Sequence, residues 1–110
     1  MNKVELIGRL TRDPRLDKTT RDISYSKFNI AVKRTFKTND GQDADFISCV
    51  AWEKIAENLC NIAHKGDRVA VVGHLQSRQY EAEGTTRYAL EIMVDELVII
   101  DYKKKEEPEF

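Results

Sequence analysis

The sequence predicts an all-β barrel with one short helix, and two observations carry this prediction. Apolar and polar residues alternate over most of the chain, and the alternation gives way once, near residues 53–63, to a helical period. The 110 residues suit one domain of ordinary size. Hydrophobic residues make up 41% of the chain and charged residues 34%, which is usual for a folded globular protein and too apolar for a disordered one.

The first three strands follow from the alternation. One is expected over residues 4–10, where apolar side chains occupy one parity until Asp13-Pro14 gives a turn signal. The second, over residues 25–36, has one apolar and one polar side, as in a sheet with one buried face. Residues 38–42 form a hairpin loop, because Asn, Asp and Gly tolerate left-handed backbone conformations. Residues 45–52 return as the third strand.

A helix is expected next, because the apolar period changes. Ile55, Leu59 and Ile62 recur at helical spacing, while polar residues occupy the positions between them. Lys65-Gly66-Asp67 ends the helix, since glycine suits the C-terminal cap or the turn that follows it. The helix therefore lies between strands three and four.

Two long strands complete the barrel. Residues 68–81 alternate again, and their length predicts a bend near Gly73. Residues 83–85 make a second hairpin loop, and residues 87–102 return and close the barrel. Three strands, a helix and two strands are the order of an OB-fold, a five-stranded Greek-key barrel with a helix between strands three and four. We expect this domain to span residues 1–102 and a short, flexible, charged tail to span residues 103–110.

The sequence indicates no membrane span, no metal site and no redox motif. The charged N-terminus contains neither a secretory apolar segment nor a membrane span, which predicts a cytoplasmic protein. Cys49 and Cys60 are expected to be reduced and packed, and a zinc site formed by them with His64 and His74 would lack short paired ligand spacing. No phosphate-binding loop or catalytic constellation is present, so we expect no enzyme activity and no cofactor.

Aromatic residues beside cations are the main indication of function. Phe36, Phe46, Trp52 and Tyr80 each lie at or near a strand end and close to Arg or Lys. A ring can stack on a nucleobase while the neighbouring charge meets a phosphate. The chain has a net charge of −1, but residues 1–40 carry +5 and the remainder −6, which leaves room for a basic face.

A series of motifs points to a known family. They are Asn2-Lys3-Val4, the run from Gly8 to Pro14, the runs Phe28–Val32, Trp52–Glu57 and Val71–Leu75, and the pairs Lys65-Gly66 and Arg87-Tyr88. In order and spacing, over about residues 1 to 101, this series resembles the bacterial and phage single-stranded DNA-binding proteins, the SSB family.

The resemblance implies roles for individual residues. The four aromatic residues fall on the family's base-stacking positions, and cations fall on or beside its phosphate-contacting positions. Gln76 and Gln79 stand where relatives often carry Arg or Lys, which implies either weaker binding or a shallower salt dependence. The expected DNA-binding residues are Lys3, Arg34, Phe36, Lys37, Phe46, Trp52, Lys54, Lys65, Arg78, Tyr80 and Arg87.

For several aromatic residues the pattern alone allows a second interpretation. Trp52, at the join of strand and helix, either stacks a base or plugs the barrel end. Phe28 and Tyr88 alternate with core positions and are interpreted as packing residues. Tyr25 and Tyr102 stay undecided.

The resemblance also implies partners and an alternative. Single-stranded DNA is the expected ligand and a homotetramer the expected assembly, with a dimer as the alternative; Ile47 suits such an interface. The location is the bacterial nucleoid, or the host cytoplasm for a phage protein. The rival functions are a primosome-type OB-fold adaptor, acting mainly through proteins, and an OB-fold that binds RNA or serves as a purely structural interaction module. Replication and repair proteins are expected to dock on the acidic tip of the tail, Glu106, Glu107, Pro108, Glu109 and Phe110.

Overall fold

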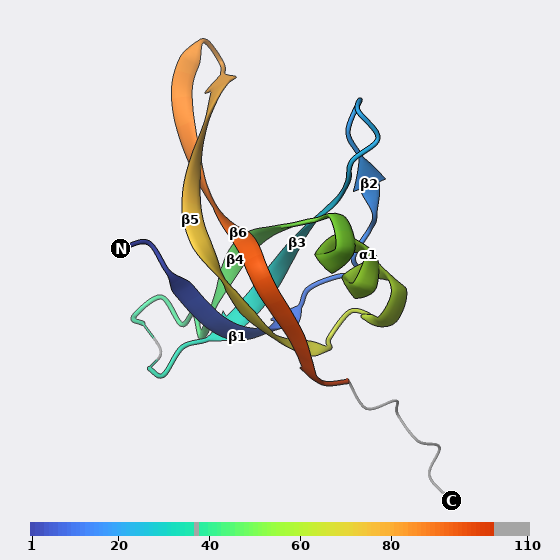
Figure 1. Ribbon diagram of the computed structural model, residues 1–110. Helices are drawn as coiled ribbons and strands as arrows, with labels where there is room; N and C mark the ends of the chain where they lie inside the picture. The colour runs from blue at the N-terminus through green and yellow to red at the C-terminus, as the bar shows by residue number, and fades with distance from the viewer. Residues whose placement is uncertain (37, 103–110) are drawn as a thin grey trace, which may run out of the picture.

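Five strands close into a ring. Figure 1 draws their arrangement in the computed structural model, which describes residues 1–36 and 38–102. The hydrogen-bonded order is β1-β5-β6-β4-β3, and β1 pairs with β3 as well, which closes the barrel. The predicted OB-fold is thereby confirmed. The strands are β1 (Val4–Leu10), β3 (Ser24–Lys33), β4 (Ala44–Trp52), β5 (Arg68–Ala82) and β6 (Thr85–Asp101).

The helix lies where the sequence places it. α1 (Glu53–Ile62) follows β4 directly and buries Ala56 and Leu59 in the barrel core. Its first residue, Glu53, has a φ of 53°, and this left-handed residue turns the chain from strand into helix. None of the helices in residues 1–36 and 38–102 combines the length and apolar character needed to cross a membrane.

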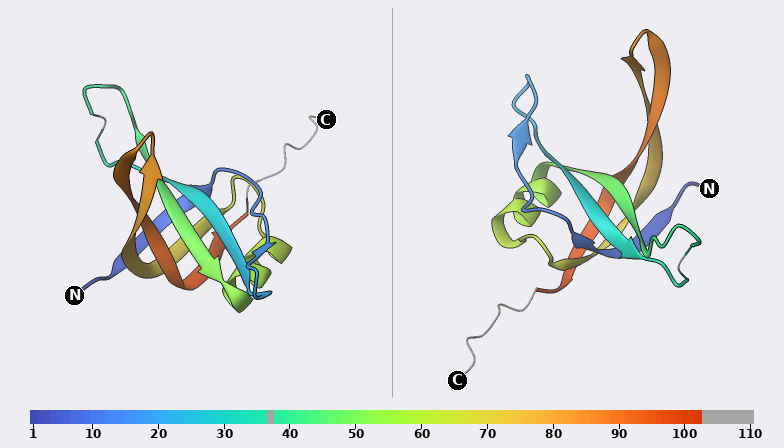
Figure 2. Two further views of the ribbon diagram at one scale, coloured as in Figure 1. Left: turned by 90° about the horizontal axis from the view of Figure 1, so that it is seen from above. Right: turned by 180° about the vertical axis from the view of Figure 1, so that it is seen from behind.

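Two elements differ from the expectation. The two-residue strand β2 (Asp17–Lys18), which no alternation announces, pairs with the start of β3. The second long strand ends at Lys33, so that Phe36 lies in the β3–β4 loop and not on the strand. Figure 2 shows that loop on the side of the molecule away from α1.

The core is formed mainly by one side of each strand. On β3, Phe28 and Ile30 are buried while Lys27 and Asn29 are exposed, as the alternation predicts. Burial of each large apolar side chain stabilises the fold by about 1.5–3 kcal/mol. The other buried apolar residues of the strands and of the turn after α1 are Leu10, Cys49, Val50, Ala51, Ala63, Val69, Val71, Ile92 and Val94.

β5 and β6 continue beyond the barrel as a two-stranded arm, which projects far from the rest of the molecule in Figure 1. Its tip is a two-residue turn with φ of 53° at Glu83 and 76° at Gly84, the conformation preferred in tight hairpins. The arm corrects one prediction, because Tyr88 is 69% exposed instead of packed. Tyr88 continues the core parity of β6 past the point where the ring covers that side.

The bend predicted near Gly73 coincides with a register shift between Val72 and Gly73. Here the backbones of β5 and β6 approach closely, since a Cβ atom added to Gly73 would lie 2.1 Å from the carbonyl oxygen of Met93. Only glycine fits this position without displacing a neighbouring strand.

Replacing Gly73 by alanine is expected to destabilise the protein by about 1–3 kcal/mol, because the methyl group must displace backbone. Gly41→Ala is the control, as Gly41 has a φ of +80° but nothing lies within 4 Å of the position that an added methyl group would take. Urea unfolding followed by circular dichroism measures both. A smaller loss for Gly73→Ala than for Gly41→Ala would contradict the close approach.

Candidate nucleic-acid interface

The closed ladder places five of the eleven predicted site residues on one side of the sheet, away from the core. On β4, Cys49 and Ala51 are buried in the core, so Phe46 and Trp52 lie on the opposite side. We call this side the outer face. It comprises Tyr25 and Lys27 of β3, Phe46 and Trp52 of β4, Arg78 and Tyr80 of β5, and Arg87 of β6.

The strand register shows that the outer face continues from the barrel onto the arm. Val50 lies on the same side of β4 as Phe46 and Trp52, and it is paired with Met93 of β6. The β5–β6 ladder then runs from Met93 to the tip without a register shift, and Tyr80 lies opposite Arg87. Residues opposite each other share a side, so Tyr80 and Arg87 lie on the same face as the β4 rings.

The rings on this face are accessible. Phe46 is 67% exposed, Trp52 41% and Tyr80 40%. Trp52 packs one side against Tyr25, with ring centroids 5.3 Å apart and planes inclined by 34°. Trp52 therefore lies on the surface with Tyr25 and does not fill the barrel interior. Exposed large rings are the surfaces on which bases stack.

On the arm, Arg78 joins a ring to an acidic side chain. Its guanidinium lies 5.6 Å from the centroid of the Tyr80 ring, a cation–π distance, and its Nε donates to Glu91 Oε1 at 3.2 Å. These contacts hold Arg78 in place beside Tyr80. They also use part of its charge, because Glu91 is almost fully buried and has Arg78 as its ion-pair partner.

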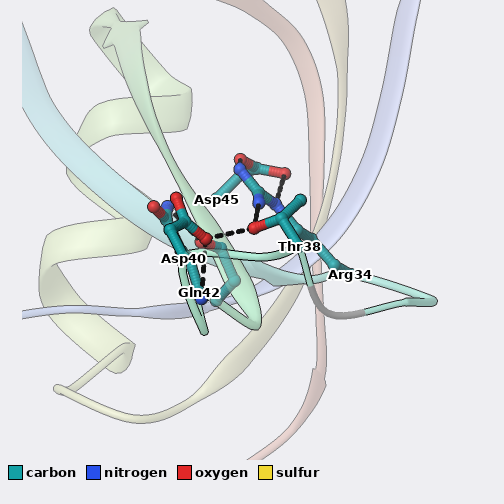
Figure 3. Close-up of polar contacts among 6 residues, drawn as sticks. Arg34, Thr38, Asp40, Gln42 and Asp45 are labelled. Atoms are coloured by element: carbon teal, nitrogen blue, oxygen red, sulfur yellow. Dashed lines mark hydrogen bonds and ion pairs between the residues drawn. The ribbon is translucent and has the colours of Figure 1, made fainter.

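The β3–β4 loop is fixed by a polar network, drawn in Figure 3. Arg34 donates to both carboxylate oxygens of Asp45, at 3.0 and 2.5 Å, and to the Thr38 hydroxyl at 2.9 Å. Thr38 donates in turn to Asp40, which also accepts from the Gln42 backbone. The hydrogen bonds and charge of Arg34 lower the pKa of Asp45, and Asp45 raises the pKa of Arg34.

The network bears on two predicted ligands of the loop. Arg34, expected to contact phosphate, is occupied by Asp45 and is only 25% exposed at its side chain. Phe36 stands free of the network at 83% exposed. Lys37, the third residue predicted here, lies outside the described residues, as do Glu106, Glu107, Pro108, Glu109 and Phe110 of the tail.

The remaining predicted cations fall into two places. Lys3 lies beside His74 at the base of the arm. Its neighbours fix this position, because Asn2 is hydrogen-bonded to Leu75 and Val4 is paired with Gly73. The ammonium of Lys3 is 3.3 Å from the Glu5 carboxylate. Lys54 follows Trp52 in the first turn of α1, and Lys65 lies in the loop after α1. Lys54, Lys65 and Arg87 have no ion-pair partner within residues 1–36 and 38–102.

The structure adds two cations that the sequence reasoning missed. Lys27 and Lys33 lie on the outer side of β3, opposite Val50 and Ala44 of β4. Both are exposed. The signal was present, because both belong to the polar parity of residues 25–36, but parity alone does not say which strand lies beside β3.

No catalytic or metal chemistry is suggested by the described part of the chain. It holds no group of three or more His, Cys, Asp or Glu side chains arranged to bind a metal ion. Burial raises the pKa of the Cys49 thiol to about 12, so this thiol stays protonated and unreactive near neutral pH. What the outer face offers is exposed rings and cations, a combination suited to binding bases and phosphates.

Comparison with known proteins gives a consistent match. Residues 1–100 match the model of the single-strand binding protein family. A single-stranded DNA-binding protein of Oceanobacillus iheyensis is 44% identical over 105 residues, covering 94% of this chain and 65% of the relative. Single-stranded DNA-binding protein 1 of Streptococcus pyogenes is 45% identical over 103 residues, covering 92% of this chain and 79% of the relative.

A third relative is longer. The single-stranded DNA-binding protein of Lactiplantibacillus plantarum is 41% identical over 109 residues, which cover 97% of this chain and 54% of that protein. The chain thus spans between about half and four fifths of the length of these relatives. The part matched by the family model contains every described residue of the outer face.

Acidification is expected to loosen the β3–β4 loop. The pKa of Asp45 lies below its ordinary value of 3.8, so the stability contributed by its pairing is fully present above about pH 4 and is lost as pH falls through the lowered pKa. Thermal unfolding of the protein and of Asp45→Asn over a descending pH series measures this. The variant is expected to show a smaller decline below about pH 4, and parallel curves would refute the assignment.

Proposed function

The chain belongs to the single-strand binding protein family, and from this premise we propose that it binds single-stranded DNA without sequence preference, covering the strand during replication, recombination and repair. One observation supports the proposal most. Phe46 and Trp52 of β4 and Tyr80 of the arm lie exposed on a single outer face together with Arg78 and Arg87.

The proposed mechanism combines two kinds of contact. Bases stack on the four rings, since every base has a π face, and this contact tolerates any sequence. Phosphates bind to cations of the protein. This binding releases the counterions of the DNA, so the affinity falls as the salt concentration rises. Lys54, Lys65 and Arg87 are unpaired within the described residues and Lys3 is exposed, whereas Arg34 acts mainly by shaping the loop that carries Phe36.

The rival functions have less support. An adaptor that acts mainly through proteins has no need of exposed rings and cations along one face. An RNA-binding OB-fold would be revealed by preference for oligo(U) over oligo(dT). We place the protein in the bacterial cytoplasm, where such DNA is exposed. Docking of replication and repair proteins on the tail, residues 103–110, stays a prediction that lies outside the described residues.

We also propose that copies of the chain assemble, as a homotetramer or, alternatively, a dimer. The side of the arm opposite Tyr80 carries Leu75, Tyr88 and Leu90, exposed by 43%, 69% and 66%. We call these three residues the inner strip. They continue the apolar parity of Ile92, which is buried in the core, and an apolar sheet face of this kind is usually covered by another surface. Ile47, the interface position expected from the sequence, is partly buried against the core.

Loss of a stacking ring is expected to weaken DNA binding. Tyr80→Ala should cost about 1–3 kcal/mol in affinity for oligo(dT), because one base loses its platform. Trp52 is the only tryptophan of the chain, so its fluorescence reports binding directly. Tyr102→Ala is the matched control, since this tyrosine is also exposed but lies beside α1 and the end of β6. The proposal fails if oligo(dT) leaves Trp52 fluorescence unchanged at low salt, or if both tyrosine variants lose the same affinity.

A charge on the inner strip is expected to disrupt assembly. Leu90→Lys places an ammonium where the proposed interface excludes water, and light scattering should then report a smaller mass. Leu16→Lys, at an exposed leucine of the loop before β2, is the control and should leave the mass unchanged. An unchanged mass for Leu90→Lys would exclude the inner strip as an interface. DNA binding is measured independently by Trp52 fluorescence, so the assembly proposal and the DNA-binding proposal are tested separately.

A further inference from the structure

A polar hollow of about 290 Å³ lies at the edge of the outer face, between the loop before β2 and β3. From β3 it is lined by Lys27 and Asn29, which point away from the core. From the other wall it is lined by Thr11, Arg12 and Arg15, together with the acidic residues Asp13 and Asp17. None of these residues was among the DNA ligands expected from the sequence.

The hollow is preformed by hydrogen bonds that tie its walls together. The backbone N–H and the hydroxyl of Thr11 both donate to the carbonyl oxygen of Asn29, at 3.2 and 3.3 Å. Asp13 accepts from the backbone N–H of Lys65 at 2.7 Å. Gly66 donates to the carbonyl oxygen of Leu10 at 2.8 Å. The loop is thus held against both β3 and the loop after α1.

Positive charge in the hollow is available to a ligand. The side chains of Arg12 and Lys27 have neither an ion-pair nor a hydrogen-bond partner in the described part of the chain. Arg15 has only a distant one, 3.9 Å from Asp17, and its side chain is 87% exposed. Asp13, by contrast, already accepts a hydrogen bond from Lys65. Two unpaired cations and one weakly paired cation face two acids, which favours an anion.

The hollow is continuous with the predicted stacking surface. Tyr25, which packs on Trp52, is two residues from Lys27 on the same side of β3, and Lys27 lies opposite Val50 of β4. Neighbouring strands are about 4.8 Å apart, a smaller distance than one extended nucleotide spans. Lys65, expected to contact phosphate, adjoins the other wall through its bond to Asp13.

We infer that the hollow is a phosphodiester subsite, in which a DNA strand leaving Trp52 crosses β3 at Lys27 and passes beside Arg12 and Arg15. This inference rests on the proposed function, and it extends the bound strand past the four aromatic residues. The ligand is recognised by its phosphate charge, so the subsite is blind to base sequence.

Oligo(dT) of graded length tests the subsite, with Trp52 fluorescence followed at several salt concentrations. The test variant carries Arg12→Gln and Lys27→Gln. The matched control carries Lys18→Gln and Arg21→Gln, which remove the same charge from the neighbouring β2 turn, where Lys18 is paired with Asp22. Circular dichroism confirms that both variants are folded.

The test variant should bind long oligonucleotides several-fold more weakly than the unsubstituted protein, and its log-log salt slope should be smaller by about 1.4, since each lost contact removes about 0.7. Oligonucleotides that span only the aromatic residues should bind all three proteins equally. Equal losses in test and control variants, no loss, or a loss independent of length would each overturn the subsite. Failure of every protein to quench would instead refute DNA binding itself.

Discussion

Closure of the ring is the constraint on which the remaining structure depends. β1 pairs with β5 along most of its length and with β3 at Arg9 and Leu10, so no strand of the ring is free to slip in register. A slip of one residue would exchange the buried and exposed sides of a strand. The closed ladder therefore decides both that Ile30 and Ile92 form the core and that Phe46 and Trp52 face outward.

Where closure stops, the character of the strands changes. On the arm, β5 and β6 have only each other, and both of their sides meet solvent. One side carries Tyr80 with its stacked Arg78, and the other carries Tyr88 and Leu90. The same alternation that gives the barrel one interior gives the arm two different surfaces, so the proposed DNA contact and the proposed contact with a second copy of the chain use different sides of one hairpin.

The sequence predicts those features that depend on a short period. Alternation located the five strands of the ring, and the spacing of Ile55, Leu59 and Ile62 located α1. The sequence pattern could not show that Tyr88 lies beyond the ring, because the alternation of side chains along one strand does not tell where the opposing strand ends. Nor could it show that Arg34 is bound by Asp45 eleven residues away, or that Lys27 adjoins β4, since these facts arise from pairing between strands.

The register shift beside Gly73 decides where the arm begins. From Gly73 to the tip the ladder with β6 is unbroken, and the irregular point of the pairing lies at the base of the arm. At this point the backbones of β5 and β6 lie too close for any side chain at position 73. Because Tyr80 lies near the tip, any rotation about this base would move it further than the residues beside Gly73, whereas Phe46 and Trp52 belong to the closed ring.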